Sequence, residues 1–208
     1  MKTGEKNDAF EYKAITIGDS SVGKTSIIKR YMYNTFNKEI LSTTGINYCI
    51  KDVFLKNNEK LRLKIFDTAG QEKYKSISKN YFRNTDVILF VFDLNNEDSF
   101  DNISSWINLF NECNTKNLNI PKYLLGNKSD LEKEVPQEKI DTFLSKNNNF
   151  IYKEISAKEE NDNIKNLFQE IGERLYEENK NIHRSSSKIK LIDNQKEKKK
   201  CMLSGCIV

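Results

Sequence analysis

The sequence predicts one α/β domain over residues 10–179, a mostly parallel sheet of about six strands surrounded by about five helices. Short apolar runs of strand composition alternate with stretches of helical period, as in chains whose parallel strands are joined by helices. Three of the later runs are almost continuously apolar, which is typical of strands buried on both faces. Residues 46–55 and 60–67 flank a polar turn at Asn57 and Asn58, so we expect this one pair to be antiparallel.

The elements follow in order from these patterns. The first strand is expected at residues 12–17 and the first helix at 26–34, on either side of a loop that contains two glycines. Apolar side chains in residues 99–113 fall on one face at helical spacing, which predicts one amphipathic helix there. The remaining strands are expected at 86–94, 120–127 and 149–156, and the remaining helices at 137–147 and 163–179.

The composition indicates the cellular compartment of the protein. Its 208 residues suit one domain with an appendage, and no apolar run approaches the length of about 20 residues that crosses a bilayer. The N-terminus has no signal-peptide core, and Lys2 stands where N-myristoylation requires glycine. The four cysteines form no C-x-x-C pair and His183 has no ligand-like neighbours. These features indicate a reducing, cytosolic compartment and argue against a zinc site.

Basic charge gathers at the end of the chain. Residues 180–208 hold eight Lys or Arg against Asp193 and Glu197, a net charge of +6 in a chain of +4, so residues 1–179 carry −2. We expect this segment to be a flexible, disordered tail beside the domain of residues 10–179, because it is polar and lacks periodicity. A basic tail on a domain without a basic face indicates an anionic membrane surface as partner, and no nucleic acid.

The first functional motif is GDSSVGKT at residues 18–25, which fits G-x-x-x-x-G-K-[ST] between a predicted strand and a predicted helix. Gly18 and Gly23 permit backbone angles that direct N–H groups at phosphate oxygens, Lys24 would reach the terminal phosphates, and the Thr25 hydroxyl would bind Mg²⁺. The alternative is an ordinary Gly/Ser turn before a helix, which the strand–loop–helix context disfavours. The predicted phosphate-binding segment also includes Asp19, Ser20, Ser21, Val22 and Ser26.

The second motif, IFDTAGQE at residues 65–72, ends an apolar strand with a carboxylate. Ligands of open α/β sheets bind at the carboxyl ends of the strands, so Asp67 is placed to hold Mg²⁺ through water. Gly70 offers a backbone N–H to a γ-phosphate, and Gln71 is a candidate to orient an attacking water. The competing interpretation is a strand that ends in an ordinary turn.

The third motif selects the base. Asn127, Lys128 and Asp130 follow a buried strand, and an Asp carboxylate can accept two hydrogen bonds from the N1–H and 2-amino group of guanine, which adenine lacks. A buried, unpaired carboxylate is costly, so adenine would be rejected. The segment ISAK at residues 155–158 adds a predicted N–H from Ala157 to guanine O6, and its other candidate site residues are Ser156 and Lys158.

With these motifs in order, residues 10–178 resemble a Ras-superfamily small GTPase, most closely of the Rab branch. The Rab likeness rests on TGINY, KIFDTAGQEKYKSIS and YFRNTDVILFVFDL. The resemblance implies a P-loop NTPase G domain that binds GTP or GDP with Mg²⁺ and changes shape between them. It also implies that Thr43, 19 residues after Lys24, ligates Mg²⁺ beside the γ-phosphate, and that Phe36, 12 residues after Lys24, packs on the guanine.

The resemblance further implies a set of partners and a membrane location. Rab proteins work with an exchange factor, a GTPase-activating protein, effectors, an escort protein and a GDP-dissociation inhibitor, in vesicle traffic at the cytosolic face of an intracellular membrane. Their effectors contact three aromatic residues, which fall here at Tyr48, Phe66 and Tyr81, with Phe66 in place of the usual Trp. Asn47 likewise replaces the common Asp.

The mechanism expected from these residues is slow hydrolysis of GTP. Lys24 neutralises the phosphates, Thr25 and Thr43 hold Mg²⁺, and Gln71 positions the water for in-line attack. No arginine in the motifs is an evident candidate to stabilise the transition state, so a partner would supply one. The alternatives are a non-Rab member of the superfamily, a nucleotide-held scaffold with little hydrolysis, and an ATP-using small-molecule kinase, which would need an acceptor-binding lid.

The chain ends KEKKKCMLSGCIV, which resembles a lipidation signal although Gly205 stands where C-a-a-X requires cysteine. Because Rab prenylation accepts variably placed cysteines, the resemblance implies Cys206 as the prenyl acceptor and Cys201 as a second prenyl or palmitoyl site. The lysines before Cys201 would add attraction to an anionic membrane, the second signal that one lipid chain needs. The alternative is an unmodified, solvated tail.

Overall fold

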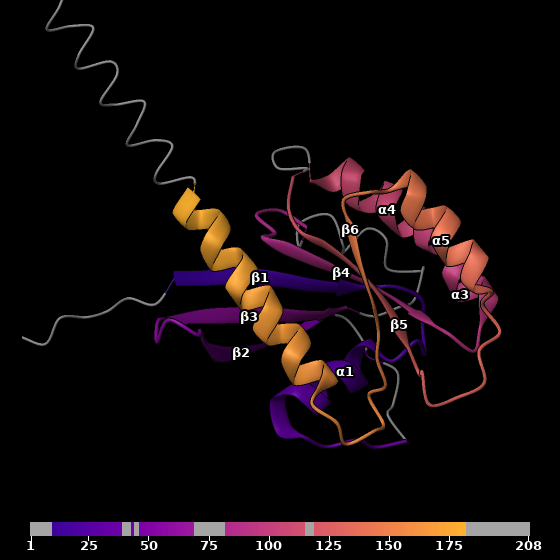
Figure 1. The fold of residues 1–208 in the computed structure, drawn as a ribbon, viewed down its shortest axis with the longest axis horizontal. Coiled ribbons are helices and arrows are strands. Elements are labelled where there is room, and N and C mark those ends of the chain that lie inside the picture. Colours follow the sequence, from indigo (N-terminus) through magenta and orange to yellow (C-terminus); the bar gives the residue numbers. More distant parts are fainter. Residues whose placement is uncertain (1–9, 39–42, 44–45, 69–81, 115–118, 182–208) are drawn as a thin grey trace, which may run out of the picture.

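The computed structural model describes residues 10–38, 43, 46–68, 82–114 and 119–181 (Figure 1). Within these ranges the chain forms a six-stranded sheet in the order β2-β3-β1-β4-β5-β6. All neighbouring strands are parallel except β2 and β3, which are antiparallel, as their hairpin pattern predicts. The strands are β1 (Phe10–Ile17), β2 (Ile46–Phe54), β3 (Lys60–Thr68), β4 (Val87–Asp93), β5 (Lys122–Asn127) and β6 (Phe150–Glu154).

Helices cover both faces of the sheet. Side chains of α1 and of the final helix pack with one set of strand residues, while those of α3, α4 and α5 pack with the other set. In Figure 1 the final helix lies across β1 and β3. The helices are α1 (Lys24–Tyr33), α3 (Glu97–Asp101), α4 (Ile103–Cys113), α5 (Gln137–Lys146) and a final helix at residues 163–181.

The two-sided burial is clearest in β4. Leu89 and Val91 belong to the core beneath α1 and the final helix, whereas Phe90 and Phe92 belong to the core beneath α3 and α4. Each of these four side chains is fully buried. The continuous apolar composition therefore reflects a central strand that alternates between two cores, which confirms the predicted architecture.

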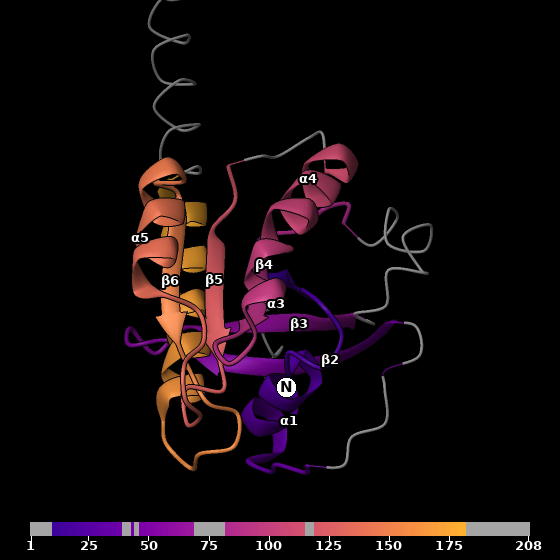
Figure 2. The ribbon, with the colours of Figure 1, turned by 90° about the vertical axis from the view of Figure 1, so that its right-hand side faces the viewer.

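The single helix predicted at residues 99–113 differs from the structure. The helical segment begins earlier, at Glu97, because the Asn96 side chain caps it by accepting a hydrogen bond from Ser99 N. It also divides into α3 and α4 at Asn102, although the two pieces follow one another along nearly the same line (Figure 2). The side chain at the break bonds to another part of the molecule, as described below.

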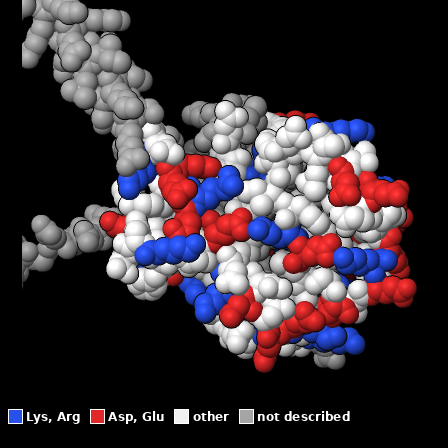
Figure 3. Space-filling model, in the orientation of Figure 1, with Lys and Arg blue, Asp and Glu red and all other residues white. Residues whose placement is uncertain are grey.

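The surface of the described residues agrees with the modest charge of the domain. On the face that carries the final helix, acidic and basic side chains are interspersed, and the described residues there form no extended basic area (Figure 3). No helix in the described ranges is long and apolar enough to cross a lipid bilayer.

Candidate functional site

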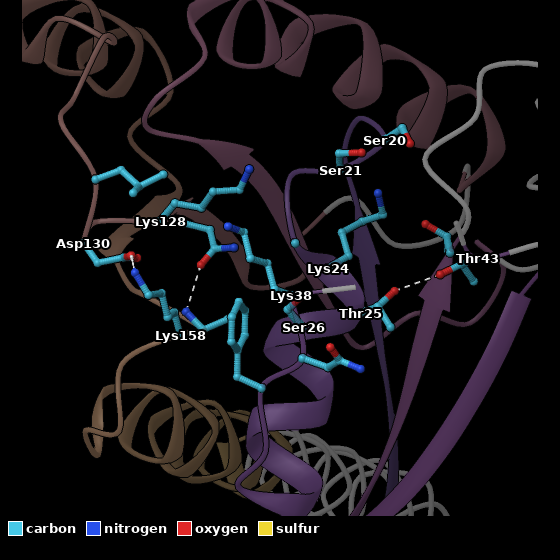
Figure 4. A pocket seen from close by; sticks show the side chains of 17 residues that line it. Ser20, Ser21, Lys24, Thr25, Ser26, Lys38, Thr43, Lys128, Asp130 and Lys158 are labelled. Atoms are coloured by element: carbon cyan, nitrogen blue, oxygen red, sulfur yellow. Dashed lines mark hydrogen bonds and ion pairs between the residues drawn. The ribbon is translucent and has the colours of Figure 1, made fainter. Parts of the chain in front are cut away.

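A cavity of about 580 Å³ opens at the carboxyl edge of the parallel strands. Figure 4 shows Lys24, Thr25 and Thr43 on one side of it and Lys128, Asp130 and Lys158 on the other. The cavity therefore joins the predicted phosphate and base motifs, which are more than 100 positions apart in the chain. The predicted residues that line it are Ser20, Ser21, Gly23, Lys24, Thr25, Ser26, Phe36, Thr43, Asn127, Lys128, Asp130, Ala157 and Lys158.

The cavity lining includes some residues that were not predicted, and some predicted residues are not part of the lining. Asn37, Lys38, Thr68 and Leu131 also line the cavity. Asn37 and Lys38 come directly after Phe36, Thr68 after Asp67, and Leu131 after Asp130. Gly18, Asp19, Val22, Asp67 and Ser156 are not part of the lining, although they contact residues that are. Gly70, Gln71, Tyr81, Cys201 and Cys206 lie outside the described residues, so their predicted roles stay predictions.

Two glycines give the loop between β1 and α1 its shape. Gly18 has φ +146°, and a Cβ there would lie 2.0 Å from Val91 O in the neighbouring strand. Gly23 has φ +98°, and a Cβ there would lie 2.2 Å from the Asn127 side-chain nitrogen. Both positions therefore exclude a side chain for steric and conformational reasons, and the loop lies close against β4 and Asn127.

Lys24 begins α1 and is folded back over this loop. Its side chain is buried, and Nζ donates hydrogen bonds to Gly18 O at 2.8 Å and Asp19 O at 2.5 Å. Burial lowers the pKa of Lys24 to about 8, against the opposing influence of the Asp67 and Asp19 charges. The loop thus holds a desolvated ammonium group at the edge of the cavity, where an anion would stabilise its charge.

Three oxygen-bearing side chains meet beside Lys24. Thr25 Oγ1 donates to Asp67 Oδ2 at 2.7 Å and lies 2.8 Å from Thr43 Oγ1. Burial raises the pKa of Asp67, while the Thr25 hydrogen bond and the charges of Lys24 and Lys29 act in the opposite direction. Asp67 Oδ1 is buried and has no hydrogen-bond partner among the described residues. Two hydroxyls and a carboxylate, one of whose oxygens has no partner, form a set of ligands that fits Mg²⁺, which prefers oxygen ligands.

Asn127 connects the two sides of the cavity. Its side chain is fully buried, donates from Nδ2 to Val22 O at 2.8 Å, and accepts from Ala157 N at 3.1 Å. It therefore fixes the phosphate loop relative to the loop at residues 155–158. The Ala157 N–H that the sequence assigns to guanine O6 is the one that donates to Asn127 here.

Asp130 presents an ionised carboxylate at the base side. Ser156 Oγ donates to Oδ1 at 2.6 Å and Lys158 Nζ to Oδ2 at 3.2 Å. Burial would raise the pKa of Asp130, but the hydrogen bonds from Ser156 and Lys158 and its backbone, with the Lys158 charge, outweigh it and lower the pKa. Lys128 is held nearby by Asp93, with 2.5 Å between Nζ and Oδ2. The lowered pKa keeps the Asp130 carboxylate charged at neutral pH, so that it can accept hydrogen bonds.

Arg30 of α1 belongs to none of the sequence motifs, yet its side chain is buried beside the site. Its Nε donates to Ala157 O at 2.9 Å and its Nη2 to Lys158 O at 2.8 Å, so α1 supports the loop at the base side. The only signal in the sequence is a basic residue among the apolar positions of a helix. Trp106, in the helix predicted at residues 99–113, also contacts the phosphate loop, because its Nε1 donates to Asp19 Oδ1 at 2.7 Å.

The structure places two of the three aromatic residues predicted to contact effectors, Phe66 and Tyr48, in different surroundings. The Phe66 ring is only 8% exposed and belongs to the core beneath α3 and α4, whereas Tyr48 is 58% exposed. The two rings lie 5.5 Å apart, and Lys13 and Lys64 place their ammonium groups 4.9 and 5.4 Å from the Phe66 ring centre. Phe66 is buried because it packs with core residues such as Phe82, so Tyr48 is the exposed member of this pair.

Comparison with known proteins gives consistent matches along the domain. The sequence model of the Ras family matches residues 13–177. The Ras-related protein Rab-3C of Bos taurus is 35% identical over 170 residues, which are 81% of this chain and 73% of the relative. The Ras-related protein Rab-3B of Homo sapiens is 36% identical over 177 residues, which are 82% of this chain and 78% of the relative. The matched family region contains every residue that lines the cavity.

Proposed function

The chain belongs to the Ras family as a Rab-like small GTPase, and from this premise we propose that it is a GTP/GDP switch with slow hydrolysis that regulates vesicle traffic. One observation supports the proposal above all others. Three separate segments of the chain meet at one cavity: Lys24 and Thr25 line it on one side, Asp130 lines it on the other, and Asp67 bonds to Thr25. This combination suits a guanine nucleotide with its metal.

The phosphates would bind between the loop at residues 18–25 and the N-terminus of α1. Backbone N–H groups there point toward an anion, and the helix dipole favours negative charge. Lys24 would exchange its hydrogen bonds to loop carbonyls for phosphate oxygens, and its buried ammonium group gains the counter-charge that the desolvated site lacks.

Thr25, Thr43 and, through water, Asp67 would hold Mg²⁺, because their oxygens gather beside Lys24. When bound, this ion supplies neutralisation of the β- and γ-phosphate charge. Thr43 contacts Thr25 in the structure, so residue 43 is placed where it can respond to the phosphate side of the cavity.

Guanine would be selected by Asp130, whose lowered pKa keeps both carboxylate oxygens ionised. In the base-bound state these oxygens would accept from N1–H and the 2-amino group, with Phe36 beside the ring. Adenine would leave the carboxylate unpaired. We expect discrimination on the order of 10⁴, as for sites built to bond a polar group that the competitor lacks.

Hydrolysis would rely on Gln71 to orient water, and on a partner for the remaining charge stabilisation. The cationic side chains among the described cavity-lining residues are all lysines: Lys24, Lys38, Lys128 and Lys158. An activating protein that inserts an arginine would therefore accelerate turnover by roughly 10³ to 10⁵. Loss of the γ-phosphate would release the Thr43 segment and Gly70, and with them the effectors that bind around Tyr48.

The tail at residues 180–208 would tether the domain to a membrane. Prenylation of Cys206, with Cys201 as a second prenyl or palmitoyl site, would act together with the basic residues that precede it. Mass spectrometry of protein from its native cell tests this proposal. Lipid on neither cysteine, and an unchanged location of tagged protein after both are substituted, would contradict it.

Competition for the purified protein tests the nucleotide assignment. Fluorescent GDP bound in Mg²⁺ buffer should be displaced by unlabelled GDP and GTP at far lower concentration than by ADP or ATP. Equal displacement by ADP would favour an ATP-using enzyme. Single-turnover hydrolysis of bound GTP then separates the switch from a scaffold with little hydrolysis, since a scaffold would retain GTP unchanged.

A further inference from the structure

Asp19 belongs to the phosphate loop, but its carboxylate is directed away from the cavity. Oδ1 accepts from Trp106 Nε1 and Oδ2 accepts from Asn102 Nδ2, both at 2.7 Å. Asp19 is absent from the cavity lining, whereas Ser20, the next residue, is part of it. Each carboxylate oxygen is thus bonded to the α3–α4 segment, which contributes no residue to the cavity lining.

The backbone of Asp19 also contacts Lys24. Its carbonyl oxygen accepts from Lys24 Nζ at 2.5 Å, so one residue contacts both α4 and the lysine of the phosphate site. Because the carboxylate is fixed by two bonds, the position of this carbonyl is fixed with it. The contacts to α4 therefore help to shape the loop around Lys24.

The chemistry of the two donors matters. Asn102 and Trp106 are neutral, so they satisfy the carboxylate through charge-assisted hydrogen bonds without adding positive charge near the site. A carboxylate released from them could rotate toward Lys24 and pair with it, or approach the bound phosphates and repel them. Either outcome weakens the binding of an anion, because the phosphates compete with the carboxylate for Lys24 or meet a like charge.

The side chains themselves indicate more than packing. Trp106 is 7% exposed, and a buried indole N–H requires an acceptor, which here is the carboxylate. Asn102 occupies the break between α3 and α4, where its side chain reaches Asp19 across 83 positions of sequence. Two independent donors on one turn of helix therefore converge on the same anion.

We infer that Asn102 and Trp106 are positioning residues of the nucleotide site, which hold the Asp19 carboxylate against α4 and away from bound phosphates. The inference rests on the proposed function, because it requires a phosphate ligand in the cavity. It gives Asp19 a role distinct from that of the neighbouring loop residues, whose backbones would contact the ligand.

Dissociation of fluorescent GDP from the full-length protein in Mg²⁺ buffer tests this inference. Trp106→Phe and Asn102→Ala should each accelerate dissociation by about tenfold or more, because each removes a hydrogen bond to a charged group. Asn108→Ala is the matched control, since Asn108 is an exposed asparagine of the same helix. It should leave dissociation unchanged.

The same substitutions made in an Asp19→Ala protein distinguish a positioning role from a packing role. In Asp19→Ala protein the donors have no carboxylate to hold, so adding Trp106→Phe or Asn102→Ala should change dissociation by less than about twofold. Equal acceleration in both backgrounds would indicate a purely structural role and overturn the inference. If Trp106→Phe fails to fold, Asn102→Ala, whose side chain is half-buried, provides the same comparison.

The remaining outcomes are also distinct. Wild-type protein that binds GDP, with variants that release it at the wild-type rate, would overturn the positioning role alone. Wild-type protein that binds no guanine nucleotide would overturn the proposed function, and this inference with it.

Discussion

Arg30 Nε donates a hydrogen bond to the carbonyl oxygen of Ala157 at 2.9 Å, across 127 positions of sequence. The same guanidinium donates to Lys158 O at 2.8 Å and is 6% exposed. The helix that begins at Lys24 thus supports the loop at the opposite side of the cavity. A buried cation joins the two sides of the candidate site.

Replacing this cation should weaken both the fold and nucleotide retention. Arg30→Met leaves the carbonyls of Ala157, Lys158 and Asn34 without their charged donor. We expect the free energy of unfolding to fall by about 3 kcal/mol, with faster release of fluorescent GDP. Urea denaturation and dissociation kinetics measure the two effects. Arg174→Met, which removes an exposed arginine 4.0 Å from Glu178, is the control and should cost less than about 1 kcal/mol. Equal effects of the two substitutions would contradict the bracing role.

Asp67 should control the metal dependence of nucleotide binding. Asp67→Asn removes the negative charge beside Thr25 but keeps the size of the side chain, so retention of GDP should require at least about tenfold more Mg²⁺. The required Mg²⁺ concentration is measured by setting free Mg²⁺ with EDTA and monitoring the release of fluorescent GDP. Asp52→Asn, in the exposed pairs of β2 with Lys60 and Arg62, should leave it unchanged. A shift that is the same for both variants would exclude a metal role for Asp67.

Asp130 should determine which base the protein accepts. In Asp130→Asn the amide can donate to the 2-oxygen of xanthine but cannot accept from both N1–H and the 2-amino group of guanine. GDP affinity should therefore fall by at least about 100-fold while xanthosine diphosphate becomes the better ligand. Competition binding checks the reversal, with Asp141→Asn on the exposed side of α5 as control. Retained preference for GDP would show that another group reads the base.

Gln71→Leu should separate binding from hydrolysis. The leucine cannot orient water, so single-turnover hydrolysis of GTP should slow by at least about tenfold, while the affinities for GTP and GDP stay within about twofold of wild type. Phosphate release and nucleotide competition measure the two quantities on the same protein. Turnover that is unchanged, with or without an activating protein, would remove Gln71 from the mechanism.

The strands and the antiparallel hairpin were predictable because their signals are local. The central strand β4 is apolar from Val87 to Phe92 because it lies between two cores. A turn at Asn58 needs a residue that tolerates positive φ, here +64°. The break at Asn102 had no such signal. Its backbone stays in the helical region, with φ −70° and ψ −12°, and the side chain bonds to a residue far away in sequence.

The burial of Phe66 is also decided outside its own strand. Its strand face carries Arg62 and Lys64, which are more exposed, so alternation along the strand alone would place Phe66 on the same open surface. Burial by residues that come from other elements, such as Phe82, overrides that local pattern. Tyr48 stays exposed because β2 is the edge strand of the sheet.

The candidate residues of the site could be proposed from the sequence alone. The proposed phosphate, metal and base motifs are short, and each requires particular residue types at fixed spacing, so Lys24, Asp67 and Asp130 stand out without coordinates. Only the tertiary structure decided which side chains hold those motifs in place. Arg30, Asn102 and Trp106 act through hydrogen bonds to residues 83 to 128 positions away, and such contacts form only when the chain brings distant segments together.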